Sequence, residues 1–182
     1  MMKTLLFLTL SFLSIANLNA QEIYIPGEIA RGETAAYYCK SRGKFFIEVR
    51  DVSNVDTTNT VYYLDGTIDP QGGEDLSGTY GHTQEDLQNI FREALTDEEW
   101  NKIKGKNGYG LTLYITADST GNIKELSILF RKDDPTLSKF PPDRLYQLEM
   151  KFKEIIKLIY NPNTIRFRNA KFMQGISYRD LK

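Results

Sequence analysis

The pattern of apolar and polar residues changes period once along the chain, near residue 83. Before that point apolar residues alternate with polar or aromatic ones, most clearly over residues 45–50, and residues 61–64 form a β-rich run of Val, Tyr, Tyr and Leu. Alternation of period two predicts strands. Tyr24 and Ile25 precede a proline, so we expect them to form a short edge strand, because proline lacks the donor that a central strand needs.

A glycine-rich loop follows this β-rich segment. It begins at Asp65-Gly66 and continues through residues 71–73 to Gly81, which makes it the longest loop in the chain. Such clusters mark turns and connections rather than regular elements. We therefore place the boundary between a β-rich segment, residues 21–80, and the remainder of the chain here.

From Thr83 the apolar residues recur at helical spacing. The first helical stripe contains Leu87, Ile90, Phe91, Ala94 and Leu95. Thr83 is the expected cap, and acidic residues follow in the first turn, where the helix dipole favours them. Thr96 and Glu99 form a capping-box pattern that predicts a second, short helix ending at Gly105.

A β-hairpin is the clearest unit of the sequence. Residues 111–117 alternate strictly, residues 118–122 read Asp-Ser-Thr-Gly-Asn, and a second strand is expected from Ile123 to Phe130. Glycine near the end of this turn suits the positive φ of tight hairpins.

A long helix and further strands complete the pattern. The helix is expected to begin at Pro141-Pro142 and to end at Asn161-Pro162, with strands at residues 165–168 and 172–178 after it. Its apolar stripe comprises Leu145, Leu148, Phe152, Ile155, Ile156 and Ile159. We expect this stripe to cover the apolar face of the hairpin, Leu111, Leu113, Ile115, Leu126, Ile128 and Phe130.

These elements predict an α+β fold, a mixed, mainly antiparallel sheet packed by two or three helices. Residues 83–182 form an αββαβ unit, and residues 21–182 are predicted to be a single domain.

The N-terminus has the pattern of a secretion signal. Met1-Met2-Lys3 is followed by an apolar run, residues 5–16, and by Asn19-Ala20 before Gln21. A run this short cannot span a bilayer, which needs roughly 20 residues. We therefore predict a cleaved signal peptide over residues 1–20 and a mature chain that does not span the membrane.

Composition limits the location and the partners of the mature chain. Gln21 stands where a lipoprotein would carry cysteine, so we expect an unlipidated protein of the periplasm or the external medium. Without Lys3 the mature chain has 22 basic and 24 acidic residues, a net charge of −2, which gives no drive for binding nucleic acid.

The hairpin and the helix after it resemble a known family. The segments LTLYITADSTGNIKELSILF and PPDRLYQLEMKFKEI, with Arg-Phe-Arg after them, look like the C-terminal domain of TonB-type energy transducers. The whole arrangement, with LTDEEWNKIKG ahead of the hairpin, resembles small secreted domains of unknown function from Gram-negative gut anaerobes. These resemblances imply a shared fold and no known activity.

Tyrosine and arginine supply the candidate binding residues. Tyr37-Tyr38 and Tyr62-Tyr63 place one ring on each face of their strands, so at least one ring of each pair must leave the core. Packing beneath the loop or the helices remains the alternative. Arg166, Arg168 and Arg179 could form a cationic stripe, although charge also protects edge strands from aggregation.

Catalytic and metal-binding patterns are sparse. Cys39, the single cysteine, is expected to be a buried apolar residue, and His82, the single histidine, to lie in a loop before a helix. Two such residues are too few for a zinc site, and residues 65–69 lack the EF-hand spacing for calcium, so we expect no metal and no cofactor. Carboxylate pairs that could serve a glycosidase stand at Glu74-Asp75, Glu85-Asp86, Glu98-Glu99 and Asp133-Asp134.

Three hypotheses about function follow. The first is a non-catalytic binding domain of the cell envelope that contacts a protein or a glycan through a tyrosine-rich sheet face or an edge strand. The second is a small hydrolase of carbohydrate or peptidoglycan that uses a carboxylate pair. The third is a structural or inhibitor protein that adds a strand to another sheet.

Overall fold

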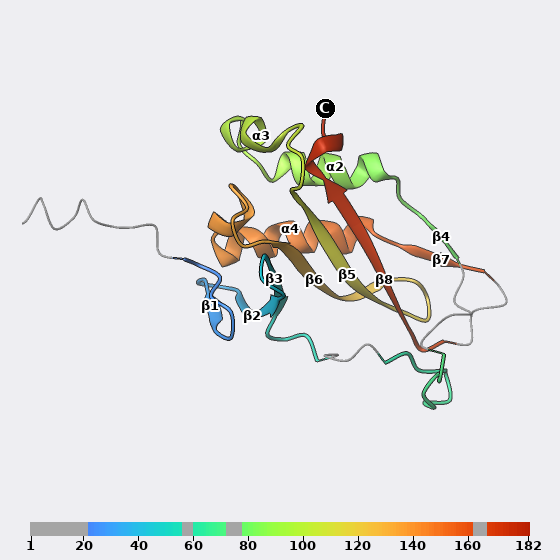
Figure 1. Ribbon diagram of the computed structural model, residues 1–182. Coiled ribbons are helices and arrows are strands. Elements are labelled where there is room, and N and C mark those ends of the chain that lie inside the picture. Colours follow the sequence, from blue (N-terminus) through green and yellow to red (C-terminus); the bar gives the residue numbers. More distant parts are fainter. Residues whose placement is uncertain (1–21, 56–59, 72–77, 162–166) are drawn as a thin grey trace, which may run out of the picture.

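The computed structural model describes residues 22–55, 60–71, 78–161 and 167–182. Over these residues the fold is α+β, with a six-stranded antiparallel sheet, a separate pair of short strands and three α-helices (Figure 1). The predicted signal peptide, residues 1–20, and Arg166 lie outside the described residues.

The large sheet has the strand order β1-β2-β3-β6-β5-β8, and every pair in it is antiparallel. The strands are β1 (Ile29–Arg31), β2 (Ala36–Arg42), β3 (Phe46–Asp51), β5 (Gly110–Asp118), β6 (Ile123–Arg131) and β8 (Asn169–Ser177). The predicted α+β fold class is confirmed.

The predicted hairpin forms the centre of this sheet. β5 and β6 pair so that Leu113 lies opposite Ile128, and the turn between them is held by the Asp118 carboxylate, which accepts hydrogen bonds from the amides of Thr120 and Asn122 at 2.9 and 3.1 Å. Gly121 has a φ of +83°, which glycine adopts without strain.

All three helices begin near the residues that the sequence predicts. α2 (Gln84–Glu93) is capped by Thr83, and α3 (Asp97–Ile103) by Thr96 with Glu99 completing the capping box. α4 (Pro142–Ile155) begins with proline in its first turn, where a missing amide hydrogen costs nothing.

The core lies between α4 and the hairpin. Leu145, Leu148 and Phe152 on α4 are all 1% exposed or less, and they pack in one cluster with the apolar face of β5 and β6. Figure 1 shows α4 running behind the sheet with α2 beside it. At about 1.5–3 kcal/mol for each large side chain buried, this contact is a main source of stability. The predicted packing of the helix on the hairpin is confirmed.

The predicted end of the long helix was wrong. α4 ends at Ile155, and Leu158–Tyr160 forms a strand, β7, that pairs with β4 (Gly78–Tyr80) within the expected loop. The amide of Leu158 donates to the carbonyl of Gly121 at 2.9 Å. The hairpin turn therefore holds the chain in an extended conformation, and Ile159 is half exposed instead of continuing the helical stripe.

Two predicted strands near the N-terminus were also wrong. Tyr24 and Ile25 form no strand, because the Tyr24 ring enters the core and its hydroxyl donates to the Phe140 carbonyl at 2.8 Å. The edge strand is β1, after Pro26-Gly27. Residues 61–64 make only isolated bridges, since the amide of Gly66 closes a turn onto the Tyr63 carbonyl and reverses the chain.

Candidate functional site

The two faces of the six-stranded sheet differ in what covers them. One face carries the core, and no helix of the described residues lies on the other, which is turned toward the viewer in Figure 1. Strand pairing places Tyr38, Arg50, Ser127, Tyr114 and Met173 in one row across this second face. We call the surface formed by these residues and their same-face neighbours the open face.

The open face presents large apolar side chains to solvent. Ile29, Tyr38 and Phe46 are 42%, 38% and 39% exposed, and Met173 at the far edge is 60% exposed. They lie on β1, β2, β3 and β8. Large apolar side chains that are exposed among polar neighbours on one surface are common at interaction sites.

Cations outnumber carboxylates on the open face. The alternation of the strands places on it the cationic residues Arg31, Lys40, Arg42, Arg50 and Lys171. Its carboxylates are Glu48, Glu125 and Asp118, of which Asp118 pairs with Lys124 at 3.6 Å. A further arginine on this face, Arg131, pairs with Asp133 at 2.8 Å. The face therefore has an excess of positive charge, although the whole chain carries a net charge of −1.

A hydrogen-bonded network fixes the centre of the open face. Glu48, which is 9% exposed, accepts from Arg42 Nε at 2.5 Å and from the Ser127 hydroxyl at 2.9 Å. The Arg42 guanidinium also lies 6.0 Å from the centre of the Tyr114 ring. A charged group held on several sides loses less conformational freedom when a ligand binds.

Arg50 is held differently. Its guanidinium lies 6.0 Å from the centre of the Tyr38 ring, and its buried Nε has no hydrogen-bond partner among the described residues. Within the same described ranges, no carboxylate forms a salt bridge with Arg50, Arg31 or Lys40. The open face therefore has cations that form no salt bridge within the described chain, although Glu48 lies opposite Lys40 on the neighbouring strand.

The first predicted tyrosine pair is divided between the two faces of β2. Tyr37 is 0% exposed, and its hydroxyl donates to Glu149 Oε2 at 2.6 Å, whereas Tyr38 lies on the open face. Glu149 is fully buried and pairs with Lys153 at 2.6 Å. Burial raises the pKa of Glu149, and burial together with the neighbouring carboxylate raises the pKa of Tyr37. Of this pair only Tyr38 can meet a partner directly.

The second pair and the predicted arginines lie elsewhere. Tyr63 stacks on Phe167 with ring centres 5.2 Å apart, and the Tyr62 amide donates to Asn169 Oδ1 at 2.8 Å. Both tyrosines are half-buried, and Arg168 is exposed. These residues gather where β8 begins and not around Tyr38, so the predicted site residues do not form one cluster.

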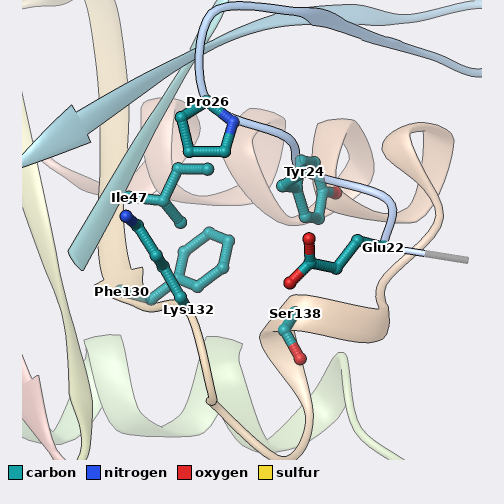
Figure 2. Close-up of a pocket in the computed structure, with 7 residues that line it drawn as sticks. All are labelled: Glu22, Tyr24, Pro26, Ile47, Phe130, Lys132 and Ser138. Atoms are coloured by element: carbon teal, nitrogen blue, oxygen red, sulfur yellow. The ribbon is translucent and has the colours of Figure 1, made fainter. Parts of the chain in front are cut away.

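A pocket of about 280 Å³ opens beside the first described residues. Its floor includes Ile47 and Phe130, and Figure 2 shows Glu22 and Lys132 on opposite sides of it, with Ser138 below. The Tyr24 ring forms part of its wall and packs edge-on against Phe130, with ring centres 5.6 Å apart. Sequence reasoning missed this pocket because it placed Tyr24 in a strand.

The carboxylate pairs mostly serve local structure. Asp86 and Glu99 complete the capping boxes of α2 and α3, and hydrogen bonds from Arg144 lower the pKa of Glu99 to about 2. Asp133 pairs with Arg131, whereas Asp134 is buried and desolvation raises its pKa. Glu74-Asp75 lies outside the described residues.

Cysteine and histidine lie where the sequence predicts. Cys39 is fully buried, which raises the pKa of its thiol, and His82 precedes α2 with Nε2 2.7 Å from Gln174 Oε1. In the described ranges no group of three His, Cys, Asp or Glu residues is arranged to hold a metal ion. No helix in these ranges is long and apolar enough to cross a membrane.

Comparison with known proteins finds similarity among solved structures. No family model and no curated protein matches the chain. The crystal structure of a DUF5043 family protein from Bacteroides uniformis is similar, with a TM-score of 0.67 and 17% identity over 86% of this chain and 88% of that chain. The similarity shows a shared fold. It supports the predicted resemblance to domains of unknown function from gut anaerobes.

Proposed function

We propose that the mature chain is an exported, non-catalytic binding domain of the cell envelope, and that the open face is its contact surface. The observation that carries the proposal is the uncovered sheet face itself. It exposes Phe46, and it exposes Tyr38 beside Arg50, a cation without a salt-bridge partner among the described residues. Exposed aromatic rings with arginine are the residues that dominate binding surfaces.

Location follows from the N-terminal sequence. Cleavage after Ala20 would release a chain beginning at Gln21, without a lipid anchor, into the periplasm or beyond the cell. The partner is then a protein or a glycan of the envelope. The resemblance of residues 83–182 to TonB-type domains stays a prediction, and we propose no role in energy transduction.

The proposal is tested by screening the mature chain, residues 21–182, on a glycan array and by pull-down from envelope extract. Tyr38→Ser should abolish binding of the partner found. The matched control is Ile155→Ser, which changes a side chain of similar exposure, 42%, on the helical side of the molecule. That control should bind as the wild type does.

Two results would contradict the proposal. The first is loss of binding in the Ile155→Ser variant with retention in Tyr38→Ser. The second is polysaccharide hydrolysis that disappears when a carboxylate is replaced. Export is tested separately by mass spectrometry of the secreted protein, which should begin at Gln21 and not at Met1.

A further inference from the structure

We infer that the open face binds an acidic polysaccharide, whose carboxylates pair with Arg31, Lys40 and Arg50 and whose sugar rings stack on Tyr38. This inference rests on the proposed function and names the chemical class of its partner. It follows from the charge, the spacing and the rings of the open face.

Charge complementarity is the first argument. Arg31, Lys40 and Arg50 have no salt-bridge partner in the described part of the chain, although acidic residues outnumber basic ones in the whole sequence. A concentration of positive charge on one surface of a slightly acidic protein attracts anions to that surface and steers their approach. The partner should therefore be negatively charged.

The spacing of the cations favours a polymer over a single ion. Arg31, Lys40 and Arg50 lie on β1, β2 and β3, three neighbouring strands. Adjacent strands lie about 4.8 Å apart and alternate residues of one strand roughly 7 Å apart. The three cations are therefore spread over the surface of the sheet. This arrangement fits charges repeated along an extended chain better than it fits one compact anion.

The aromatic rings favour sugar over an acidic peptide. Tyr38 is 38% exposed beside Arg50, so its ring offers apolar surface next to a cation. The face of an aromatic ring carries partial negative charge and attracts the weakly positive C–H groups of a pyranose ring. A uronic acid presents such a C–H face and a carboxylate on the same ring, which is the combination that Tyr38 and Arg50 fit.

A fixed network of side chains borders the binding groups. Arg42 is held by Glu48 and lies over Tyr114, and Glu48 also accepts from Ser127. Glu48 lies directly opposite Lys40, and Ser127 directly opposite Arg50. The surroundings of these two cations are therefore fixed before a polymer binds, which lowers the entropy lost on binding.

The experiment is calorimetric titration of the mature chain with polygalacturonate at low and high salt. The control ligand is fully methyl-esterified polygalacturonate, which keeps the rings and removes the charge. We expect binding of the acidic polymer, at least tenfold weaker binding of the ester, and weakening with salt because exposed charges are screened.

Single variants test the residues. Arg50→Gln should weaken binding about tenfold, as expected for a charge-assisted pair that is partly desolvated. Lys40→Gln, at an exposed position, should weaken it about threefold. The matched control is Lys151→Gln on α4, across the sheet, which should leave binding unchanged. Thermal unfolding checks that the Arg50→Gln variant folds. If that variant does not fold, Lys40→Gln still tests the inference, because Lys40 is exposed.

The outcomes separate this inference from the proposed function. Equal binding of poly-L-glutamate would overturn the choice of a sugar, because charge alone would then explain the affinity. Failure to bind polygalacturonate, with a Tyr38-dependent partner still found on the array or by pull-down, would overturn the acidic polysaccharide and leave the binding role intact. Failure of both assays would contradict both proposals.

Discussion

Asp143 connects two parts of the chain that are far apart in sequence. Its carboxylate accepts hydrogen bonds from the amides of Glu33, Thr34 and Ala35 at 2.8, 2.8 and 3.0 Å. These bonds lower the pKa of Asp143 to about 2. The turn between β1 and β2 is thereby held against the first turn of α4, next to one end of the open face.

Asp143→Asn should lower the thermal midpoint at pH 7 by a few degrees, because an amide is a weaker acceptor than the carboxylate for these donors. A lowered pKa means that the ionised carboxyl stabilises the folded state above its unfolded value near 4 and that this effect disappears as the pH falls toward 2. The difference between variant and wild type should therefore shrink over that range. Glu154→Gln, exposed on the same helix, is the control and should leave the thermal midpoint at pH 7 unchanged. A difference between Asp143→Asn and wild type that stays the same at pH 2 would contradict the prediction.

Gly121 is required by both its backbone and its neighbours. Its φ is +83°, and a Cβ built there would lie 1.7 Å from the Leu158 carbonyl oxygen. Gly121→Ala should destabilise by at least about 2 kcal/mol, since strain and a backbone clash add. Gly66→Ala is the matched control, because φ is +87° but nothing lies within 4 Å, and it should cost only about 1 kcal/mol. Urea unfolding measures the free energy of unfolding of both variants. Equal losses of stability would mean that the close approach of Leu158 adds nothing to the cost at Gly121.

At the level of elements, sequence predicted what depends on local period and capping. Thr83 and Thr96 marked the starts of α2 and α3, and alternation marked β5 and β6. The end of α4 could not be predicted, because the apolar spacing continues to Ile159. The helix ends where the Leu158 amide donates a hydrogen bond to the Gly121 carbonyl. These two residues are distant in sequence.

The same limit applies to the candidate site. The alternation over residues 45–50 predicted that Glu48 and Arg50 share one face of a strand. It did not predict which side chains of other strands lie next to them. Ser127 and Tyr114 join them only because β3 pairs with β6 and β6 with β5. A pairing order of this kind is set by packing over the whole sheet, so Tyr38 was predicted and the surrounding cations were not.

Substitutions in the apolar stripe of α4 should cost far more stability at its buried positions than at its exposed positions. Leu148→Ala should cost about 2–5 kcal/mol, because it leaves a cavity against the sheet. Ile155→Ala, at the exposed end of the same helix, should change stability by no more than about 0.5 kcal/mol. Chemical denaturation compares the two, and similar costs would contradict the packing of α4 on the hairpin.

At the scale of the molecule, the sheet separates two surfaces of different character. The helices bury one face, and the other presents tyrosine, phenylalanine and cations that form no salt bridge within the described residues. Two methionines mark these sides, since Met173 lies on the open face at 60% exposure and Met150 on α4 at 44%. The other two of the four methionines, Met1 and Met2, belong to the predicted signal peptide.

Oxidation of these two methionines tests the central claim most directly. Mature protein is treated with hydrogen peroxide, alone and with the partner found by the array or by pull-down, and sulfoxide is quantified by mass spectrometry of peptides. A partner on the open face should slow oxidation of Met173 severalfold and leave Met150 unchanged. Protection of Met150 with Met173 still reactive would place the contact on the helical side and contradict the account.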